Sequence, residues 1–238
     1  MGACARLRCA LPAARGKSIL GEGSELAGRR LVGREALKTS LCFLAIALTT
    51  VVCRGDAGAQ QVGDGIRWEA GRPLTWEDFR GPVDPDAGPL AAALTAASVS
   101  LGYELEVRTG RRCEVEVSRI ETAAEFHPEH SWAREGGRTD AVLEHEQGHF
   151  DLTEVFRAVL DREAAALVGR VEACARGADM AAIEAQVAEQ VARIREGVFA
   201  ELERVQAQYD AETGHGTVPD AQREWTARIR EALRRGAW

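Results

Sequence analysis

Two histidines and a glutamate within five residues are the part of this sequence that most clearly predicts chemistry. His145, Glu146 and His149 follow the order His-Glu-x-x-His within residues 142–153. Residues four apart share a face of a helix, so both imidazoles can bind one Zn²⁺. Glu146 follows the first ligand directly and can act as general base on a metal-bound water. The motif therefore predicts a zinc-dependent hydrolase and, among hydrolases, a metallopeptidase.

The residues around this motif predict the helix that positions it. Thr139 or Asp140 can cap the start of a helix, and an apolar stripe follows at helical spacing. We expect this helix to run unbroken to about Arg176, with both imidazoles facing inward. The stripe consists of Val142, His145, His149, Leu152, Phe156, Leu160, Leu167, Val171 and Cys174.

A catalytic zinc site usually has three protein ligands and one open position, so the motif needs a third ligand. A second stripe, with a mean spacing of about 3.6 residues, predicts another long helix from Asp179 to Tyr209. The short turn between the two helices makes them antiparallel neighbours. The second helix therefore ends near His149, and His215, which lies between two glycines just after it, is the expected third ligand.

Other side chains near the motif have alternative roles. Glu154 lies about 140° around the helix from His149 and could reach the same metal only if the helix broke. Asp210 and Tyr209 are further candidate ligands. The side chains expected to orient an imidazole are Asp151, Asp210 and Glu212. Tyr209 can donate to a developing oxyanion, which would make it catalytic, or it can simply end the apolar stripe.

A non-catalytic role is the alternative to the enzyme. His127 and His130 lie in a loop before the motif, where histidines are more often solvated, but one of them could supply a fourth ligand. Four protein ligands would give a closed, structural zinc site in an exported module. Glu146 favours the enzyme, because a structural site does not need a carboxylate beside its first ligand.

The segments on either side of the helical pair complete the expected fold. Polar and apolar residues alternate over 98–105 and again over 113–120, which predicts a β-hairpin. Upstream, Trp76 and Phe79 are expected to anchor the entry of the domain on the core. The expected class is α+β, with a small antiparallel sheet, a long antiparallel helical hairpin that carries the zincin-like motif, and a C-terminal amphipathic helix. That last helix, within residues 217–238, has Trp225, Ile229 and Leu233 on one face.

The first 59 residues have the features of a leader. An apolar run at 41–53 follows two basic residues and precedes an A-x-A site at 57–59, as in a secretory signal peptide. Thirteen residues are too few to span a bilayer as a helix. We expect cleavage after Ala59 and a secreted or periplasmic domain of residues 60–216, without stable membrane insertion. An uncleaved N-terminal anchor is the alternative.

Cys113 and Cys174 are the two cysteines that remain after this cleavage. The first lies on the apolar side of the expected hairpin, and the second lies on the stripe of the first helix. Two cysteines in an exported domain more often form a disulfide than a metal site. We expect a Cys113–Cys174 bridge, and two separate buried thiols are the alternative.

The charge of the chain excludes some partners. The first 59 residues have nine basic and four acidic residues, so the remaining 21 basic and 33 acidic residues give the rest of the chain a net charge of −12. An acidic body argues against nucleic acid or an anionic membrane surface as a partner. The expected partner is a protein or peptide substrate.

Three stretches together resemble a known family. RPLTWEDFRG at 72–81, LEHEQGHFDLTE at 143–154 and YDAETGHG at 209–216 are similar to a bacterial family of predicted secreted zinc-dependent proteases, a domain of unknown function. The likeness extends from about Trp68 to Gly216 and excludes the segment after Pro219. It implies export, a zinc cofactor and peptidase activity, and it implies no particular substrate.

Overall fold

The computed structural model describes residues 4–11, 65–88, 91–109, 112–175 and 179–238 of the chain, the first segment by its backbone alone. The chain divides into two units, one made of Met1–Gly16 with Gly55–Trp238 and the other of Lys17–Arg54. The second unit, which contains the expected apolar run at 41–53, lies outside the described residues, as does the expected cleavage site after Ala59.

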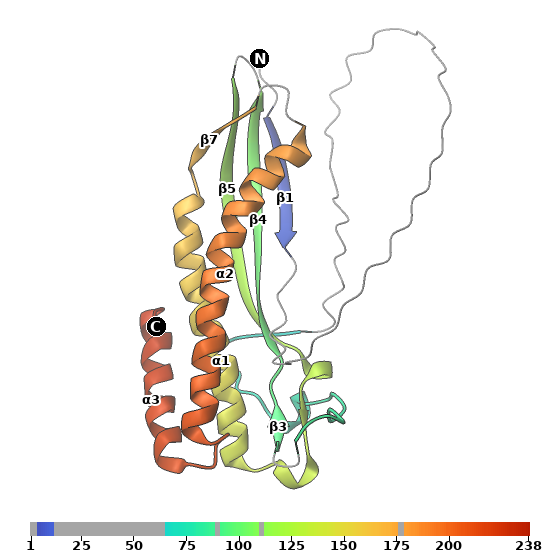
Figure 1. Ribbon diagram of the computed structural model, residues 1–238, viewed down its shortest axis with the longest axis vertical. Helices are drawn as coiled ribbons and strands as arrows, with labels where there is room; N and C mark the ends of the chain where they lie inside the picture. The colour runs from blue at the N-terminus through green and yellow to red at the C-terminus, as the bar shows by residue number, and fades with distance from the viewer. Residues whose placement is uncertain (1–3, 12–64, 89–90, 110–111, 176–178) are drawn as a thin grey trace, which may run out of the picture. The chain divides into compact units, whose positions relative to one another are not determined.

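A long β-hairpin forms the framework of the described unit (Figure 1). Strands β4 (Ala97–Thr109) and β5 (Cys113–Phe126) pair antiparallel, as the alternation of polar and apolar residues predicted. The register shifts next to Leu105, where Ser118 is the extra residue of a bulge and its hydroxyl donates to the main-chain oxygen of Glu104 at 3.2 Å. The apolar face of the hairpin is buried through Val99, Leu101, Tyr103, Leu105 and Val107.

Three short strands extend the hairpin into a five-stranded sheet. Strand β1 (Cys4–Leu11) pairs antiparallel with β4, while β2 (Ile66–Arg67) and β7 (Val171–Cys174) pair with opposite ends of β5. Part of the expected leader therefore forms a strand of the sheet, which the sequence pattern did not predict. A separate two-stranded sheet joins β3 (Ala93–Leu94) to β6 (Trp132–Ala133).

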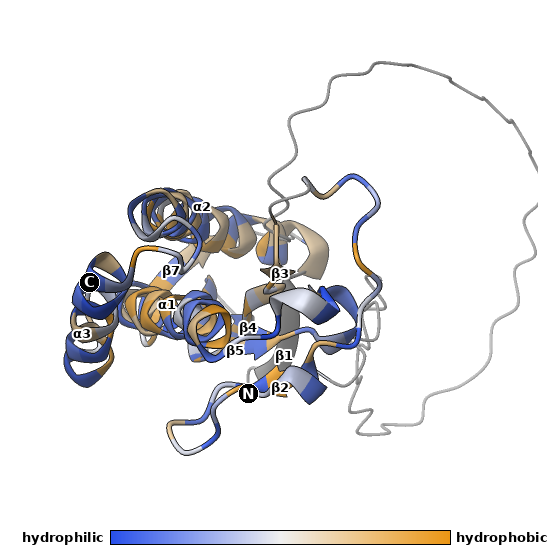
Figure 2. Ribbon diagram, turned by 90° about the horizontal axis from the view of Figure 1, so that it is seen from below, coloured by the Kyte–Doolittle hydropathy of each residue, from blue (hydrophilic) through white to orange (hydrophobic). Residues whose placement is uncertain are grey.

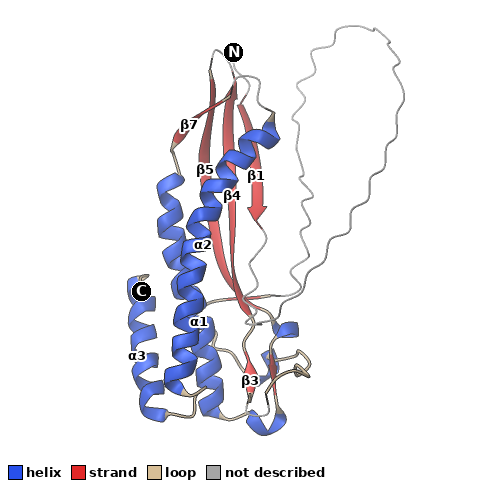
Figure 3. Cartoon of the chain, viewed as in Figure 1, coloured by secondary structure: helices blue, strands red, loops and turns tan. Residues whose placement is uncertain are grey.

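Three helices follow the hairpin, as predicted: α1 (Asp140–Ala164), α2 (Met180–Thr213) and α3 (Pro219–Arg235) (Figure 3). Helices α1 and α2 run antiparallel, and α1 packs against β4, β5, α2 and α3 (Figures 1 and 2). Thr139, one of the two expected caps of α1, accepts from the amide of Val142 at 3.3 Å, and Asp179 at the start of α2 accepts from that of Ala182 at 2.9 Å. None of the helices in the described residues is both long and apolar enough to cross a membrane.

The first helix is shorter than expected, so its predicted continuation to about Arg176 is wrong. Helix α1 ends at Ala164, and a 3₁₀ turn (Ala165–Leu167) leads to Gly169, which has a φ of +76°. The amide of Gly169 donates to the main-chain oxygen of Val117 at 2.9 Å, and β7 then pairs with β5. The sheet thus supplies the hydrogen bonds that a longer helix would have supplied, and residues 171–174 form a strand.

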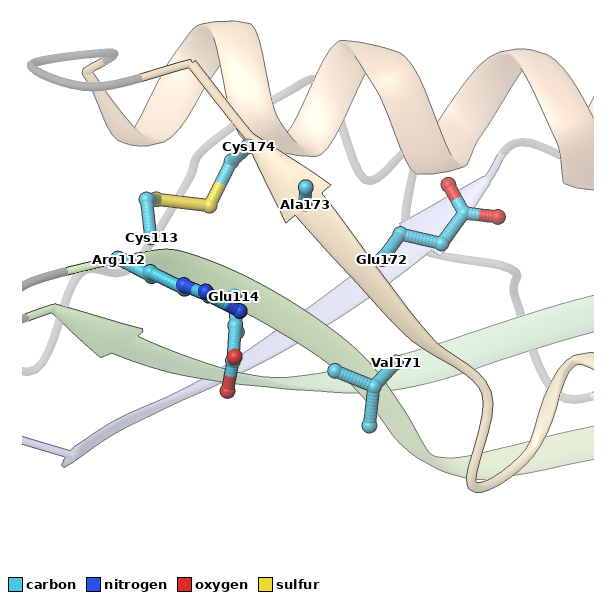
Figure 4. A pocket seen from close by; sticks show the side chains of 7 residues that line it. All are labelled: Arg112, Cys113, Glu114, Val171, Glu172, Ala173 and Cys174. Carbon is cyan, nitrogen blue, oxygen red and sulfur yellow. A yellow bond between two sulfur atoms is a disulfide. The ribbon is translucent and has the colours of Figure 1, made fainter.

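The predicted disulfide is confirmed, although one of its cysteines lies on a strand and not on a helix. Cys113 on β5 and Cys174 on β7 are cross-strand partners whose Cα atoms are 5.1 Å apart (Figure 4). The bridge lies beside the turn of the β4–β5 hairpin, and a surface pocket next to it is lined by side chains that include Arg112, Glu114 and Glu172. This pocket is at the end of the hairpin away from the start of α1 (Figure 1).

Two hydrophobic clusters hold the helices in place. The larger one lies between the hairpin and the helices and includes Leu105, Leu160 and Val191. In the smaller one, the ring centroid of Phe126 lies 5.2 Å from that of Phe79 and 5.8 Å from that of Phe150. Trp76 packs on Phe79, which confirms the expected anchoring of the entry segment. Because Phe150 follows His149 directly, this cluster fixes the helix that carries both histidines.

Candidate metal centre

The two histidines of α1 lie together, as their spacing predicted. The Nε2 atoms of His145 and His149 are 3.1 Å apart, and their rings meet edge to face at 4.7 Å. The His145 side chain is buried and that of His149 is 15% exposed. One helical turn thus places both nitrogens at the same point, at the boundary between the core and solvent.

Asp210 on α2 contacts both of these nitrogens. Its Oδ1 lies 3.1 Å from Nε2 of His145 and 2.8 Å from Nε2 of His149. In a tetrahedral zinc site with bonds of about 2.0–2.1 Å, neighbouring ligand atoms are about 3.3 Å apart. The three atoms therefore form a triangle of the right size for one ion. Asp210 was expected either as a further candidate ligand or as a residue that orients an imidazole, and the structure places its Oδ1 among the candidate ligand atoms.

His215 also reaches the site, at its rim. Its Nδ1 lies 3.4 Å from Oδ1 of Asp210, and His145, Asp210 and His215 can offer ligand atoms that all lie within 4.8 Å of one another. The His215 side chain is 75% exposed. Because Oδ1 of Asp210 lies close to Nε2 of both His145 and His149, Asp210 is the best placed third ligand. His215 is a candidate for an additional ligand.

The loop that carries His215 has an uncommon backbone. Gly214, His215 and Gly216 have φ values of 55°, 55° and 81°, and His215 is the one residue other than glycine with a positive φ among the described residues. A left-handed conformation costs such a residue on the order of 1–3 kcal/mol, and such strain is common at functional sites. A Cβ on Gly216 would lie 2.9 Å from Cβ of His145, so glycine is required where this loop packs against the motif helix.

Helix α2 brings Asp210 and His215 to the motif, although the length estimated for the first helix was wrong. Helix α2 has 34 residues and α1 has 25. At a rise of 1.5 Å per residue, α2 is about 51 Å long and extends past the full length of α1. The end of α2 therefore reaches the start of α1 whether the chain between them is a helix or a strand.

The Nδ1 atoms of both histidines face hydrogen-bond acceptors. Nδ1 of His145 is 3.3 Å from Oε1 of Gln222 and 3.3 Å from Oγ1 of Thr213, whose own hydroxyl donates to the main-chain oxygen of Tyr209. Nδ1 of His149 contacts Oε1 of Gln206, whose amide nitrogen donates to the main-chain oxygen of His149. These contacts place the ring proton on Nδ1 and leave the Nε2 lone pair for a cation.

These orienting residues differ from the expected ones, and two predicted roles are wrong. Asp151 accepts from the indole of Trp68 at 2.8 Å and from Gln147 at 2.7 Å. Glu212 accepts from Trp225 at 2.7 Å and from Gln208. Both carboxylates therefore hold elements together and do not orient an imidazole. Helical spacing could have indicated both glutamines, because Gln222 lies three residues before Trp225 and Gln206 lies three residues before Tyr209.

The electrostatics of the site indicate a position for a cation. Burial lowers the pKa of His149, but the hydrogen bond and charge of Asp210 and the charge of Glu146 raise it to about 9. Burial would raise the pKa of Asp210, but hydrogen bonds from His145 and His149 and their positive charge hold it far below its usual range. Positive charge is therefore favoured beside the carboxylate, and a metal ion would supply it.

Glu146 has a buried carboxylate beside these groups. The residue is 5% exposed, and its Oε2 has no hydrogen-bond partner among the described residues. Buried carboxylate oxygens are normally satisfied by a protein group, a water or an ion. The negative charge of this carboxylate contributes to the raised pKa of His149. This arrangement leaves Glu146 available to accept a proton from a molecule bound in the site.

Tyr209 supports the site from inside the core. Its ring stacks on that of His145 at 4.6 Å, and the residue is fully buried. Its hydroxyl donates to the main-chain oxygen of His145 at 3.1 Å and accepts from Gln222 at 2.7 Å, while burial raises the pKa of Tyr209. The predicted oxyanion role is therefore wrong, because the hydroxyl is occupied and inaccessible. Tyr209 ends the core stripe and positions His145.

The remaining candidate ligands lie elsewhere. Nε2 of His127 is 2.7 Å from the hydroxyl of Ser98, and His130 is exposed on the following turn. Glu154 forms a two-point ion pair with Arg157 at 2.8–2.9 Å. None of these three side chains belongs to the ligand group that the described residues form around His145.

The comparisons with known proteins give one match. The sequence model of a family described as bacterial protein of unknown function (DUF922) matches residues 76–216. This segment includes the motif of α1 and the end of α2, and it stops before α3. No curated protein and no solved structure matches the chain.

Proposed function

Because the chain belongs to the DUF922 family of bacterial proteins of unknown function, we propose its function from the site itself: it is a zinc-dependent hydrolase that cleaves peptide bonds. The observation that carries this proposal is the convergence of Nε2 of His145, Nε2 of His149 and Oδ1 of Asp210 within 2.8–3.1 Å of one another. Two imidazoles and one carboxylate are a donor set that suits Zn²⁺ and leaves a fourth position open.

Glu146 has the role of general base. Zinc supplies Lewis acidity, which polarises a carbonyl and lowers the pKa of a water. The Glu146 carboxylate takes the proton of the attacking water and passes it to the leaving amine. Its buried Oε2, which has no protein partner among the described residues, supports this role because the oxygen is free to bind a molecule in the site. His145 and His149 hold their proton on Nδ1 throughout and keep Nε2 directed to the ion.

We further propose that the protein acts in an exported location on a protein or peptide substrate. The Cys113–Cys174 disulfide supports export, because such bonds persist in oxidising compartments. The expected leader agrees with this location. The net acidity of the rest of the chain argues against a nucleic-acid substrate.

Glu146→Gln tests the proposal. This variant should bind zinc as the wild type does and lose hydrolysis of a panel of unfolded proteins by several orders of magnitude, because it lacks the base and keeps the ligands. Glu163→Gln is the matched control, since Glu163 is exposed on the same helix. Turnover by Glu146→Gln at the wild-type rate would show that the proposed mechanism is wrong.

A structural zinc site is the second candidate, and the position of His215 favours it. With Nδ1 of His215 only 3.4 Å from Oδ1 of Asp210, four protein side chains could close the coordination shell. X-ray absorption of the zinc-loaded protein separates the candidates. Three protein ligands and one further oxygen support the hydrolase, whereas three imidazoles and one carboxylate oxygen support the structural site.

A further inference from the structure

Gln222 links the candidate metal centre to a helix that lies outside the family match. It is on α3, after the matched residues 76–216, and it is 4% exposed. Its Oε1 is 3.3 Å from Nδ1 of His145, and its Nε2 is 2.7 Å from the hydroxyl of Tyr209. We propose that Gln222 is a positioning residue of the metal centre and that α3 is part of the site; this inference rests on the proposed zinc function.

The direction of each hydrogen bond determines what Gln222 can do. The Tyr209 hydroxyl gives its proton to the main-chain oxygen of His145, so it accepts from the amide nitrogen of Gln222. That contact orients the amide group with Oε1 toward His145, and an amide oxygen can only accept. In the zinc-loaded protein, Gln222 would therefore hold a proton on Nδ1 of His145 and leave the Nε2 lone pair for the ion.

The same amide also holds the ring of Tyr209, which is stacked on the His145 imidazole at 4.6 Å. One side chain thus fixes the tautomer of the imidazole, and through Tyr209 it also fixes the plane in which the imidazole lies. Thr213 offers a second acceptor to Nδ1 of His145, but its own hydroxyl donates to the main-chain oxygen of Tyr209 and not to the ring hydroxyl. Loss of Gln222 would therefore leave Thr213 as an acceptor for Nδ1 of His145. The Tyr209 hydroxyl would lose the hydrogen bond that it accepts from Gln222.

Helix α3 is held firmly enough to carry this role. The indole of Trp225 donates to Glu212 on α2 at 2.7 Å, and the hydroxyl of Thr226 donates to Glu144 on α1 at 3.0 Å. At the far end, Arg162 of α1 donates to the main-chain oxygen of Gly236 at 2.9 Å. These contacts join α3 to both helices that supply metal ligands, so the position of Gln222 is set by the same elements as the site.

Zinc affinity tests this role directly. Loss of a group that orients a metal-bound histidine typically lowers affinity by about 10–100-fold. Gln222→Met keeps the volume and removes both hydrogen bonds, so we expect its zinc Kd to rise by about that factor. Gln222→Glu keeps an acceptor for Nδ1 but loses the donor to the Tyr209 hydroxyl, so its Kd should rise less than that of Gln222→Met. Glu224→Ala, an exposed position on α3, is the control and should match the wild type.

The measurement is competition for Zn²⁺ with a chromophoric chelator, together with thermal unfolding of each metal-free variant. Equal affinity of Gln222→Met and the wild type, or equal weakening by Met and Glu, would overturn the positioning role. If Gln222→Met does not fold, the tautomer of His145 in the zinc-loaded wild type decides, from its ¹⁵N chemical shifts: a proton on Nδ1 supports the role, and a proton on Nε2 overturns it. A wild type that binds no zinc would instead overturn the proposed function, and the inference with it.

Discussion

Gly148 lies against the hydroxyl of Tyr209 so closely that a Cβ at this position would be 2.2 Å from that oxygen. The glycine inside the His-Glu-x-x-His motif thus allows α2 to pack on α1 at the level of the two histidines. Contact at this distance is possible only without a side chain, because even a methyl group would displace the tyrosine ring that stacks on His145.

Gly148→Ala is therefore predicted to destabilise the protein and to weaken zinc binding. In an exposed helix, glycine to alanine normally stabilises by about 0.5–1 kcal/mol. Overpacking at this buried contact should outweigh that gain and cost about 1–3 kcal/mol. Chemical denaturation of the metal-free protein measures the difference. Gly197→Ala on α2 is the control, since a Cβ there meets nothing within 4 Å, and it should stabilise. A gain in stability from both variants would contradict the packing account.

Asp210 and His215 are predicted to differ in their contribution to zinc affinity. Asp210→Ala removes a ligand atom that contacts both Nε2 atoms, so it should abolish tight binding. His215→Ala should weaken binding much less if three ligands hold the ion, and as strongly as Asp210→Ala if four do. Zinc content after dialysis against a mild chelator measures both, with Glu203→Ala, an exposed position on α2, as control. Retention of zinc by Asp210→Ala alone would return the third-ligand role to His215.

The metal-free protein is predicted to lose stability as the pH rises from about 6.5 to about 9. Burial lowers the pKa of His149, but the hydrogen bond and charge of Asp210 raise it in the folded state from its ordinary value of 6.5 to about 9. Protonated His149 therefore contributes stability fully below pH 6.5, and this contribution disappears as the pH passes through about 9. Denaturation midpoints of chelator-treated protein at several pH values measure it. The His149→Gln variant should lack this decrease. If the stability of the wild type also stayed constant over this pH range, the assignment of the effect to His149 would be refuted.

Zinc binding at pH 7.5 is predicted to release protons. In the metal-free protein, His149 is protonated and lies against the Asp210 carboxylate. The ion must displace that proton when it binds to the imidazole. Calorimetric titration of zinc in two buffers with different ionisation enthalpies gives the number of protons released. Release should be smaller in His149→Gln, and an absence of proton release from the wild type would contradict the proposed ligation.

Removal of the disulfide is predicted to lower stability without affecting the metal centre. The bridge closes a loop with a sequence separation of 61 residues, which corresponds to roughly 4 kcal/mol in the chain-entropy model. Cys113→Ala with Cys174→Ala should show this loss in chemical denaturation and should bind zinc with wild-type affinity, because the bridge lies at the other end of the hairpin from the start of α1 (Figure 1). A large loss of zinc affinity in the folded double variant would show that the two regions are coupled.

Much of the fold could be predicted because its signals are local. Alternation of polar and apolar residues predicted the β4–β5 hairpin, and a period of about 3.6 predicted α2. The end of α1 could not be predicted in this way, because the apolar residues 167, 171 and 174 have helical spacing although residues 171–174 form a strand. Pairing with β5 decided between the two, and that partner lies more than fifty residues away in the sequence.

By itself, the sequence determined which residues could form the centre of the site, because helical periodicity alone brings His145 and His149 to one face beside Glu146. It also determined that Cys113 and Cys174 could pair. Only the tertiary structure decided that Asp210 lies among the ligand atoms, that Tyr209 is a buried support and that Gln222 faces Nδ1 of His145. These contacts join three helices across 64–77 residues of sequence, and packing between helices, which no local period specifies, sets their distances.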